Sequence, residues 1–227
     1  MVSVMPCTAK KFEIARPEMG RDGYRDVDAN ITTRELARMI RQAAIDYVNL
    51  PDEPFDDMLG DSTGAAVIFG ATGGVMEAAL RTVADVLEGK DLESIEYTAV
   101  RGLEGIKEAT VQVAGMDIKV AIAHGTANAG RLLNSIRKGE RTYHFIEIMG
   151  CPGGCVTGGG QPIVNARTRY QIDPREARAK ATYECDRAMP IRKSHQNPSI
   201  HKLYGEFLEK PGSHKAHALL HTTYVER

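Results

Sequence analysis

The sequence has 227 residues, of which 29 are basic and 30 are acidic, and its formal net charge is −1. This length is enough for one or two compact domains with a sizeable core. The near balance of charge produces no large field that would attract nucleic acid or an anionic membrane surface. We therefore expect specific sites to select the partners, and no binding to nucleic acid.

No apolar stretch reaches the length that a membrane span requires, and the first residues, MVSVMPCTAKK, lack the pattern of a signal peptide. We expect a cytoplasmic protein without a membrane span. The four cysteines are too few and too unevenly placed for a disulfide scaffold in a chain of this size. They are Cys7, Cys151, Cys155 and Cys185. Metal or redox chemistry is the better expectation.

Residues 1–87 contain two predicted apolar strands and two predicted helices. Residues 1–5 are predicted to form a buried strand that ends before Pro6, and a parallel neighbour for it would place the start of the chain in mid-fold. Residues 31–47 are predicted to form an amphipathic helix with Thr32 and Thr33 as candidate N-caps and Glu35 in its first turn. Residues 64–74 are predicted as an apolar strand that runs into a glycine-rich turn, and a helix follows over about 75–87.

Strands and helices alternate further along the chain. Strands are expected over 95–100, 106–113, 116–124 and 143–149, with a helix over 128–138. The alternation predicts an α/β fold with a mostly parallel sheet and flanking helices, in which functional sites gather at the carboxyl ends of strands. From Arg167 onward prolines divide a polar sequence into short helices and loops, which we expect to wrap around the rest of the chain as a tail.

The densest chemical signal is the segment from Glu147 to Pro162, EIMGCPGGCVTGGGQP. Cys151 and Cys155 flank Pro-Gly-Gly, and glycine allows a backbone to fold closely around a bulky inorganic group. Backbone amides of such a loop can also point at anionic sulfur. A disulfide turn, a zinc knuckle and a flexible surface loop remain the alternatives, and the lack of a second close cysteine pair disfavours zinc. Iron–sulfur ligation is favoured.

A second segment, MPCTAKKFE at 5–13, places Cys7 at the end of the first strand and Lys10 three residues later. A thiolate beside an ammonium is typical of a site that holds negative charge. By itself this segment is a weak signal, because cysteine is often a buried structural residue and lysine is often a solvated surface charge.

Together the two segments resemble the second and third cysteine motifs of the FeFe (iron-only) hydrogenases, MPCxxKxxE and ExMxCPGGCxxGGGQP. Every fixed letter of both motifs is present. The resemblance extends over the whole chain, since further family-like stretches include residues 32–36, 69–78, 143–147, 193–195 and 220–224. It implies part of a two-lobed catalytic domain over residues 1–166 and a small-subunit-like tail over residues 167–227.

The resemblance also implies a cofactor, the H-cluster, in which a 4Fe-4S cubane is joined to a two-iron subcluster with carbonyl, cyanide and dithiolate ligands. Cys7 and Cys151 would bind the cubane and Cys155 would bridge its two parts. Lys10 would contact a cyanide ligand. Met5 and Met149 would pack around the two-iron subcluster. The implied reaction is the reversible oxidation of dihydrogen, in an enzyme linked to ferredoxin or NAD.

The sequence departs from the family in lacking its first cysteine motif, TSCCPxW, which supplies the fourth cubane ligand, and it contains no tryptophan. We expect a missing N-terminal segment or partner subunit to supply it, and we expect maturation proteins and ferredoxin as further partners. Cys185 is interpreted as an ordinary core or surface thiol, with a substitute cluster ligand as the alternative. His214, His217 and His221 are interpreted as tail residues rather than a metal site, and the Gly70–Gly74 turn lacks the spacing of phosphate loops.

Two functions compete. The first is a hydrogenase fragment, and the second is a non-catalytic iron–sulfur protein of the hydrogenase-like cluster-assembly type. The CPGGC and GGGQP motifs are complete, and Met149 and Lys10 are present, which favours the hydrogenase over the cluster-assembly protein. A third possibility is a binding subunit without a cluster.

Overall fold

The computed structural model describes residues 1–56, 59–93, 96–223 and 225. These residues form two compact units, each assembled from separate stretches of the sequence. The first unit comprises Met1–Asp61, Gly158–Ile163 and Pro198–Arg227, and the second comprises Ser62–Thr157 and Val164–Asn197. The chain therefore passes from one unit to the other within the segment that carries the cysteine loop.

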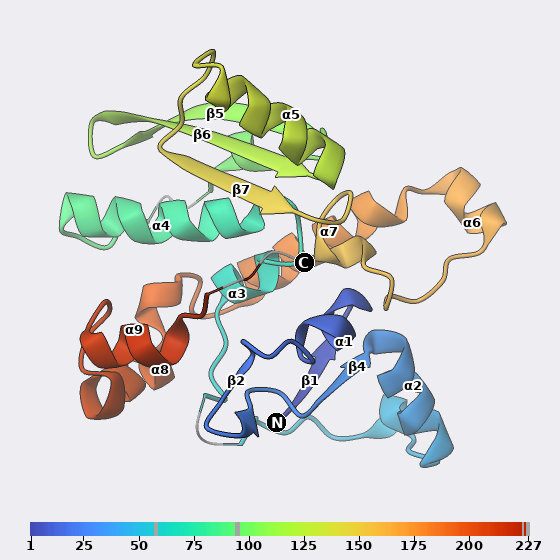
Figure 1. Ribbon diagram of the computed structural model, residues 1–227. Helices are drawn as coiled ribbons and strands as arrows, with labels where there is room; N and C mark the ends of the chain where they lie inside the picture. Colours follow the sequence, from blue (N-terminus) through green and yellow to red (C-terminus); the bar gives the residue numbers. More distant parts are fainter. Residues whose placement is uncertain (57–58, 94–95, 224, 226–227) are drawn as a thin grey trace. The chain divides into compact units, whose positions relative to one another are not determined.

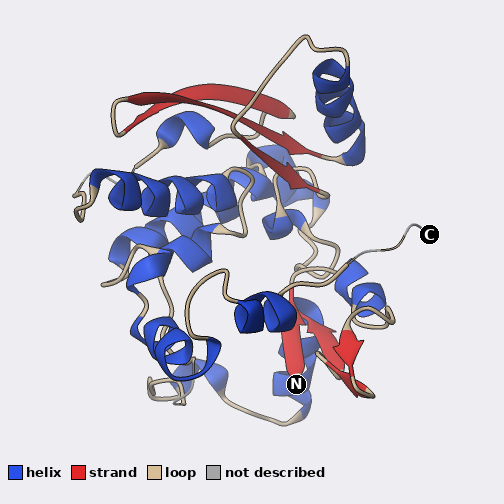
Figure 2. Ribbon diagram, turned by 60° about the vertical axis from the view of Figure 1, so that its left-hand side comes forward, coloured by secondary structure: helices blue, strands red, loops and turns tan. Residues whose placement is uncertain are grey.

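The first unit is built around two parallel strands, β1 (Val2–Met5) and β4 (Ala29–Thr32), which Figure 2 shows in red beside the N-terminus. The predicted strand at the start of the chain is confirmed, but it is not buried: the exposed fractions of Val2 and Val4 are 59% and 46%. The strand is short and has one partner, so alternate side chains face solvent.

A capping box starts the helix α2 (Thr33–Gln42). The Thr32 hydroxyl accepts the Glu35 amide at 3.2 Å, and the Glu35 carboxylate accepts the Thr32 amide at 2.7 Å. The predicted N-cap is thus confirmed. The helix ends earlier than predicted, because Ala44 lies at a φ of 54° and turns the chain away from the helical path.

Short elements complete the first unit. They are α1 (Ala9–Glu13), β2 (Gly20–Arg21), β3 (Tyr24–Arg25), the 3-10 helix η1 (Tyr47–Asn49), α8 (Pro198–Leu203), the π-helical turn η5 (Tyr204–Leu208) and α9 (His214–Leu220). The strands β2 and β3 form a hairpin.

The second unit contains a three-stranded sheet with the strand order β5–β6–β7. The strands β5 (Ile106–Val113) and β6 (Met116–His124) are antiparallel, whereas β6 and β7 (Phe145–Met149) are parallel, with α5 (Thr126–Arg137) as the crossover helix. Figure 1 shows α5 on one face of this sheet and α4 (Gly74–Glu88) on the other. The β6–β7 register pairs His124 with Met149, so both strands end at the same edge.

Each face of the sheet has its own apolar core. On the α4 face, Met76 and Leu80 pack with Val111, Val120 and Ile122. The alternate residues of β6, Ala121 and Ala123, pack with Leu132 on the α5 face. Alternate side chains of β6 therefore pack on opposite faces of the sheet, one set towards α4 and the other towards α5. The remaining elements of this unit are α3 (Gly64–Ile68), η2 (Thr98–Val100), η3 (Cys155–Thr157), α6 (Ala166–Gln171), α7 (Pro174–Ala188) and η4 (Ser194–Gln196).

The α/β class, with parallel strand pairs and flanking helices, is confirmed, and two antiparallel pairs add to it. The strands predicted at 106–113 and 116–124 are confirmed over the same residues. The helix expected over 128–138 begins two residues earlier, and the strand expected over 143–149 begins at Phe145. Among the described residues, no helix combines the length and apolar character needed to cross a bilayer.

Two strand predictions are wrong. Residues 64–68 form the helix α3, because the Thr63 hydroxyl caps the Ala66 amide at 3.2 Å and Gly64 lies against Asp186 of α7. A short apolar run does not distinguish a strand from a buried helix. Residues 98–100 of the strand predicted at 95–100 form a 3-10 turn, and Ile95 lies outside the described residues.

Candidate functional site

The CPGGC segment forms a tight loop at the carboxyl end of β7. Gly153 and Gly154 adopt φ angles of +87° and +97°, which only glycine takes without strain. The Gly154 amide donates to the Cys151 carbonyl at 3.0 Å. A Cβ on Gly154 would lie 2.7 Å from the Thr72 nitrogen, so this loop approaches a neighbouring backbone closely. Cys155 then begins the 3-10 turn η3.

The loop is fastened to the turn that precedes α4. The Thr72 amide donates to the Gly153 carbonyl at 3.1 Å, and the Val156 amide donates to the Gly70 carbonyl at 2.9 Å. On the other side, the Arg178 guanidinium donates to the Val156 carbonyl at 3.0 Å. Sequentially distant segments of the second unit thus hold the two cysteines of the loop.

Glu147, the first letter of the third motif, binds the N-terminus of α4. Its carboxylate accepts the amides of Gly73 at 2.6 Å and Met76 at 2.7 Å. Burial raises the pKa of Glu147 overall, although these amides and the positive charge of Lys107 oppose the rise. The amides of Gly73 and Met76 are therefore occupied by a protein carboxylate.

Lys107 lies beneath the same turn and is 6% exposed. Its ammonium donates to the carbonyls of Val100 at 2.8 Å, Gly102 at 2.9 Å and Thr72 at 3.3 Å. Burial lowers the pKa of Lys107 to about 8, even though Glu147 and Glu104 favour the charged form. The lysine ties η2 and the turn before α4 to β5.

In the first unit, the end of the third motif meets the second motif. The Gly160 amide donates to the Pro6 carbonyl at 3.0 Å, and the Arg34 guanidinium donates to the Gly159 carbonyl at 2.7 Å. A Cβ on Gly160 would lie 3.0 Å from the Cys7 nitrogen and 2.7 Å from the Thr32 Cβ. Glycine is therefore required at Gly160 for the GGGQP segment to approach the backbone that carries Cys7.

The predicted site residues divide between the units. Met5, Cys7 and Lys10 lie in the first unit, where Lys10 forms an ion pair with Glu13. Met149, Cys151 and Cys155 lie in the second unit, on β7 and its following loop. All four cysteines are thiols outside disulfides; Cys7, Cys151 and Cys155 are half-buried, and Cys185 is exposed.

Neither unit by itself contains all three motif cysteines. In the described ranges, no group of three or more His, Cys, Asp or Glu side chains is arranged to hold a metal ion. This also covers His214, His217 and His221; the rings of His217 and His221 lie 4.5 Å apart. Within the second unit, the thiols of Cys151 and Cys155 and the glycine loop between them fit an iron–sulfur cluster in ligand type and in backbone conformation.

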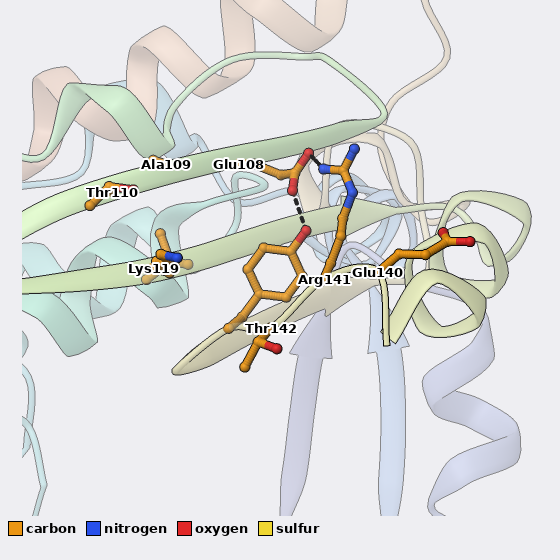
Figure 3. A pocket seen from close by; sticks show the side chains of 9 residues that line it. Glu108, Ala109, Thr110, Lys119, Glu140, Arg141 and Thr142 are labelled. Carbon is orange, nitrogen blue, oxygen red and sulfur yellow. Dashed lines mark hydrogen bonds and ion pairs between the residues drawn. The ribbon is translucent and has the colours of Figure 1, made fainter. Parts of the chain in front are cut away.

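An open depression of about 480 Å³ on the sheet lies away from the cysteine loop. Figure 3 shows Glu108 at its centre, where the carboxylate accepts hydrogen bonds from Arg141 and Tyr143. Its other lining residues are largely polar, and Lys119 comes from β6. The Glu108 carboxylate in this depression is therefore already paired with Arg141.

Comparison with known families matches the iron only hydrogenase large subunit, C-terminal domain, to residues 1–159, and the iron hydrogenase small subunit to residues 172–227. The chain belongs to the iron-only hydrogenase family. The resemblance found in the two cysteine motifs is therefore confirmed.

Several relatives have curated names. Iron hydrogenase 1 of Clostridium pasteurianum is 50% identical over 98% of the chain, and the NADP-reducing hydrogenase subunit HndD of Solidesulfovibrio fructosivorans is 49% identical over all of it. The chain spans 39% and 38% of the lengths of these two proteins. Protein NAR1 of Arabidopsis thaliana is 32% identical over 98% of the chain.

Solved structures agree with the family. A variant of the FeFe-hydrogenase HydA1 from Chlamydomonas reinhardtii superposes with a TM-score of 0.78 at 37% identity, covering 99% of this chain and 63% of that one. A structure concerned with stepwise H-cluster assembly in the FeFe-hydrogenase HydA gives a TM-score of 0.77 at 38% identity. The α/β fold described above is thus that of these hydrogenases.

Residues that sequence reasoning missed lie around the cysteine loop. His124 is the clearest of these: its ring accepts the Gly153 amide at 2.8 Å and is 5% exposed. The sequence could have identified His124 as a candidate, because it is the last residue of a predicted strand and functional residues gather at the carboxyl ends of strands. Lys107 gave no such signal, because it lies within β5.

Proposed function

We propose that this chain is the C-terminal portion of an FeFe hydrogenase that oxidises dihydrogen or reduces protons reversibly. The observation that supports this most strongly is the loop between Cys151 and Cys155, in which Gly153 and Gly154 take positive φ angles and neither flanking cysteine forms a disulfide. The 49–50% identity to curated hydrogenases over nearly the whole chain agrees with it.

In this proposal Cys7 and Cys151 bind the 4Fe-4S cubane, and Cys155 bridges it to the two-iron subcluster. When bound, the H-cluster supplies the open iron site at which dihydrogen is cleaved or formed. Lys10 offers a positive charge to anionic ligands of the cluster, and Met5 and Met149 provide soft apolar packing. A cubane takes four thiolates, so the fourth comes from a segment or subunit outside this chain.

The same proposal includes the division of the chain and its partners. Residues 1–166 belong to the catalytic domain, and residues 167–227 correspond to the small-subunit-like tail. We expect ferredoxin or an NAD-linked partner as the electron carrier, maturation proteins that deliver the two-iron subcluster, and a cytoplasmic location. Because the chain covers less than half of its curated hydrogenase relatives, the activity belongs to the assembly that includes the missing part.

Cluster assembly is the alternative function. It is supported by the name of the Cytosolic Fe-S cluster assembly factor narfl of Xenopus tropicalis, which is 31% identical over 98% of the chain. The lower identity, and the complete letters around Met149 and Lys10, favour the hydrogenase.

The experiment joins the chain to an upstream hydrogenase segment that carries the TSC-type motif and reconstitutes it anaerobically with iron and sulfide. Iron content and the EPR signal of the reduced cubane report cluster binding, and dihydrogen evolution after addition of the two-iron subcluster reports catalysis. Cys155→Ser should abolish evolution, whereas the matched variant Cys185→Ser should retain it. Cubane binding without any dihydrogen evolution would favour the assembly function, and a protein without iron would refute both.

A further inference from the structure

The peptide group between Pro152 and Gly153 is bonded by a side chain at each end. The Thr157 hydroxyl lies 2.6 Å from the Pro152 carbonyl oxygen, to which it donates, and the Gly153 amide donates to Nδ1 of His124 at 2.8 Å. Both residues lie in the second unit, as do the two cysteines that flank this peptide.

His124 is itself held firmly at the end of β6. Its amide donates to the Gly105 carbonyl at 3.1 Å, its carbonyl accepts the Asn128 side-chain amide at 2.7 Å, and the next amide, that of Gly125, donates to the Met149 carbonyl at 2.8 Å. The imidazole therefore projects from a strand that is registered against the strand leading to Cys151.

The ring must be neutral at Nδ1 to accept a backbone amide, which places the proton on Nε2. Burial lowers the pKa of His124, and the positive charges of Lys107 and Arg175 lower it further. The surroundings thus favour the form of the ring that this hydrogen bond requires.

The peptide needs such restraint because the next two residues are glycines. Gly153 has no Cβ to limit its dihedral angles, so the Pro152–Gly153 peptide plane can rotate unless its own carbonyl and amide are bonded. The following peptide is bonded separately, through the Gly153 carbonyl to the Thr72 amide and the Gly154 amide to the Cys151 carbonyl. Rotation of the Pro152–Gly153 peptide would alter the path between Cys151 and Cys155. Thr157, whose hydroxyl also lies 3.0 Å from the Gly154 carbonyl, closes the loop from its far side.

We propose that His124 and Thr157 are positioning residues which hold the Pro152–Gly153 peptide in one orientation and so preset the separation of the Cys151 and Cys155 thiols for cluster binding. This role rests on the proposed function. Neither side chain is a ligand in that proposal; both act through the backbone of the loop.

Paired variants test each end of the peptide. His124→Leu removes the acceptor, and His124→Asn keeps an oxygen near the position of Nδ1. Thr157→Val removes the hydroxyl at constant shape, and Thr157→Ser keeps it. The matched control is His144→Leu, because Nδ1 of His144 accepts the Lys119 amide at 2.9 Å at the opposite end of β7. That variant removes the same kind of bond away from the loop.

The first readout is hydrogen exchange of the Gly153 amide in the iron-free chain. We expect His124→Leu to accelerate exchange by about tenfold or more, because the amide loses its acceptor, and we expect His124→Asn to restore slow exchange. His144→Leu should leave this amide unchanged. Circular dichroism identifies any variant that fails to fold, and Thr157→Val then tests the same peptide from its exposed end.

The second readout is the cluster in the chain joined to its upstream segment. We expect His124→Leu and Thr157→Val to lose iron to a chelator about ten times faster and to broaden the EPR signal of the reduced cubane, with the Asn and Ser variants close to wild type. Equal exchange and equal iron loss in His124→Leu and wild type would overturn the inference and leave the proposed function intact. A wild-type protein that binds no iron would overturn both.

Discussion

The guanidinium of Arg81 and the carboxylate of Asp186 form two parallel hydrogen bonds, at 2.8 and 2.9 Å, between fully buried side chains. They join α4, in the part of the chain that matches the hydrogenase large subunit, to α7, in the part that matches the small subunit. Burial alone would raise the pKa of Asp186, but hydrogen bonds from Arg81 and Arg192 lower it overall.

Asp186→Asn should destabilise the second unit by about 3 kcal/mol, because it leaves a buried guanidinium with one carboxylate fewer. This loss of unfolding free energy is small for a broken buried ion pair, because the Glu77 carboxylate still accepts a hydrogen bond from Arg81 at 2.8 Å. Urea unfolding measures it. The control is Glu184→Gln on the same helix, which removes an exposed 3.8 Å pair with Lys180 and should change stability by less than about 0.5 kcal/mol. Equal stability of the two variants would contradict the prediction.

Gly154→Ala should impair cluster binding as well as stability. The added Cβ would meet the Thr72 nitrogen and the Gly70 oxygen, and alanine at a φ of +97° is strained, which together costs about 1–3 kcal/mol. We expect lower iron content after reconstitution. Gly139→Ala is the control, because Gly139 also has a positive φ, +71°, but has no atom within 4 Å of its Cβ position. Iron content that falls equally in both variants would mean that strain alone, not the close approach, is responsible.

Glu147→Gln should loosen the N-terminus of α4. The side-chain amide offers one acceptor oxygen, so one of the two backbone amides that now bind the carboxylate would face an NH₂ group. We expect a loss of about 1–3 kcal/mol in unfolding free energy and faster hydrogen exchange at Gly73 or Met76. Glu140→Gln, at an exposed site beyond α5, should change neither quantity. If hydrogen exchange at Gly73 and Met76 is unchanged in Glu147→Gln, the Glu147 carboxylate does not stabilise the N-terminus of α4.

Glu35 should make the first unit sensitive to acid. The Thr32 amide, the Lys11 ammonium and the Thr32 hydroxyl lower the pKa of Glu35 from 4.5 to about 2. Since the folded pKa lies below the unfolded one, the stabilising contribution is complete above pH 4.5 and disappears as the pH falls towards 2. A carboxyl-resolved NMR titration should place the Glu35 midpoint near the lower value.

The matching variant is Glu35→Gln, which should flatten the acid limb of the stability profile between these two pH values. Glu140→Gln should leave that limb as in the wild-type chain. If Glu35 titrates near 4.5 and Glu35→Gln loses stability at acid pH as the wild-type chain does, the capping box is not the cause of the acid sensitivity.

Some elements could be predicted from the sequence because the residues that specify them are close together in the chain. The residues at 106–113 and 116–124 predicted two strands over the ranges that β5 and β6 occupy, and the structure pairs these strands as a hairpin. Thr32 and Glu35 predicted the start of α2, because a capping box is completed within four residues. The two cysteine motifs likewise identified the family from sequence letters alone.

Other features depend on residues that are distant in the sequence, and only the tertiary structure shows them. Residues 64–68 became a helix because Thr63 caps it and Asp186 packs against Gly64, and β1 is exposed because it has one strand partner. The bond from Gly153 to His124 joins residues 29 positions apart, and the Arg81–Asp186 pair joins residues 105 apart. The sequence by itself predicted which residues would ligate a cluster, whereas only the tertiary structure showed which distant groups contact the loop that carries two of them, because those contacts leave no local periodicity.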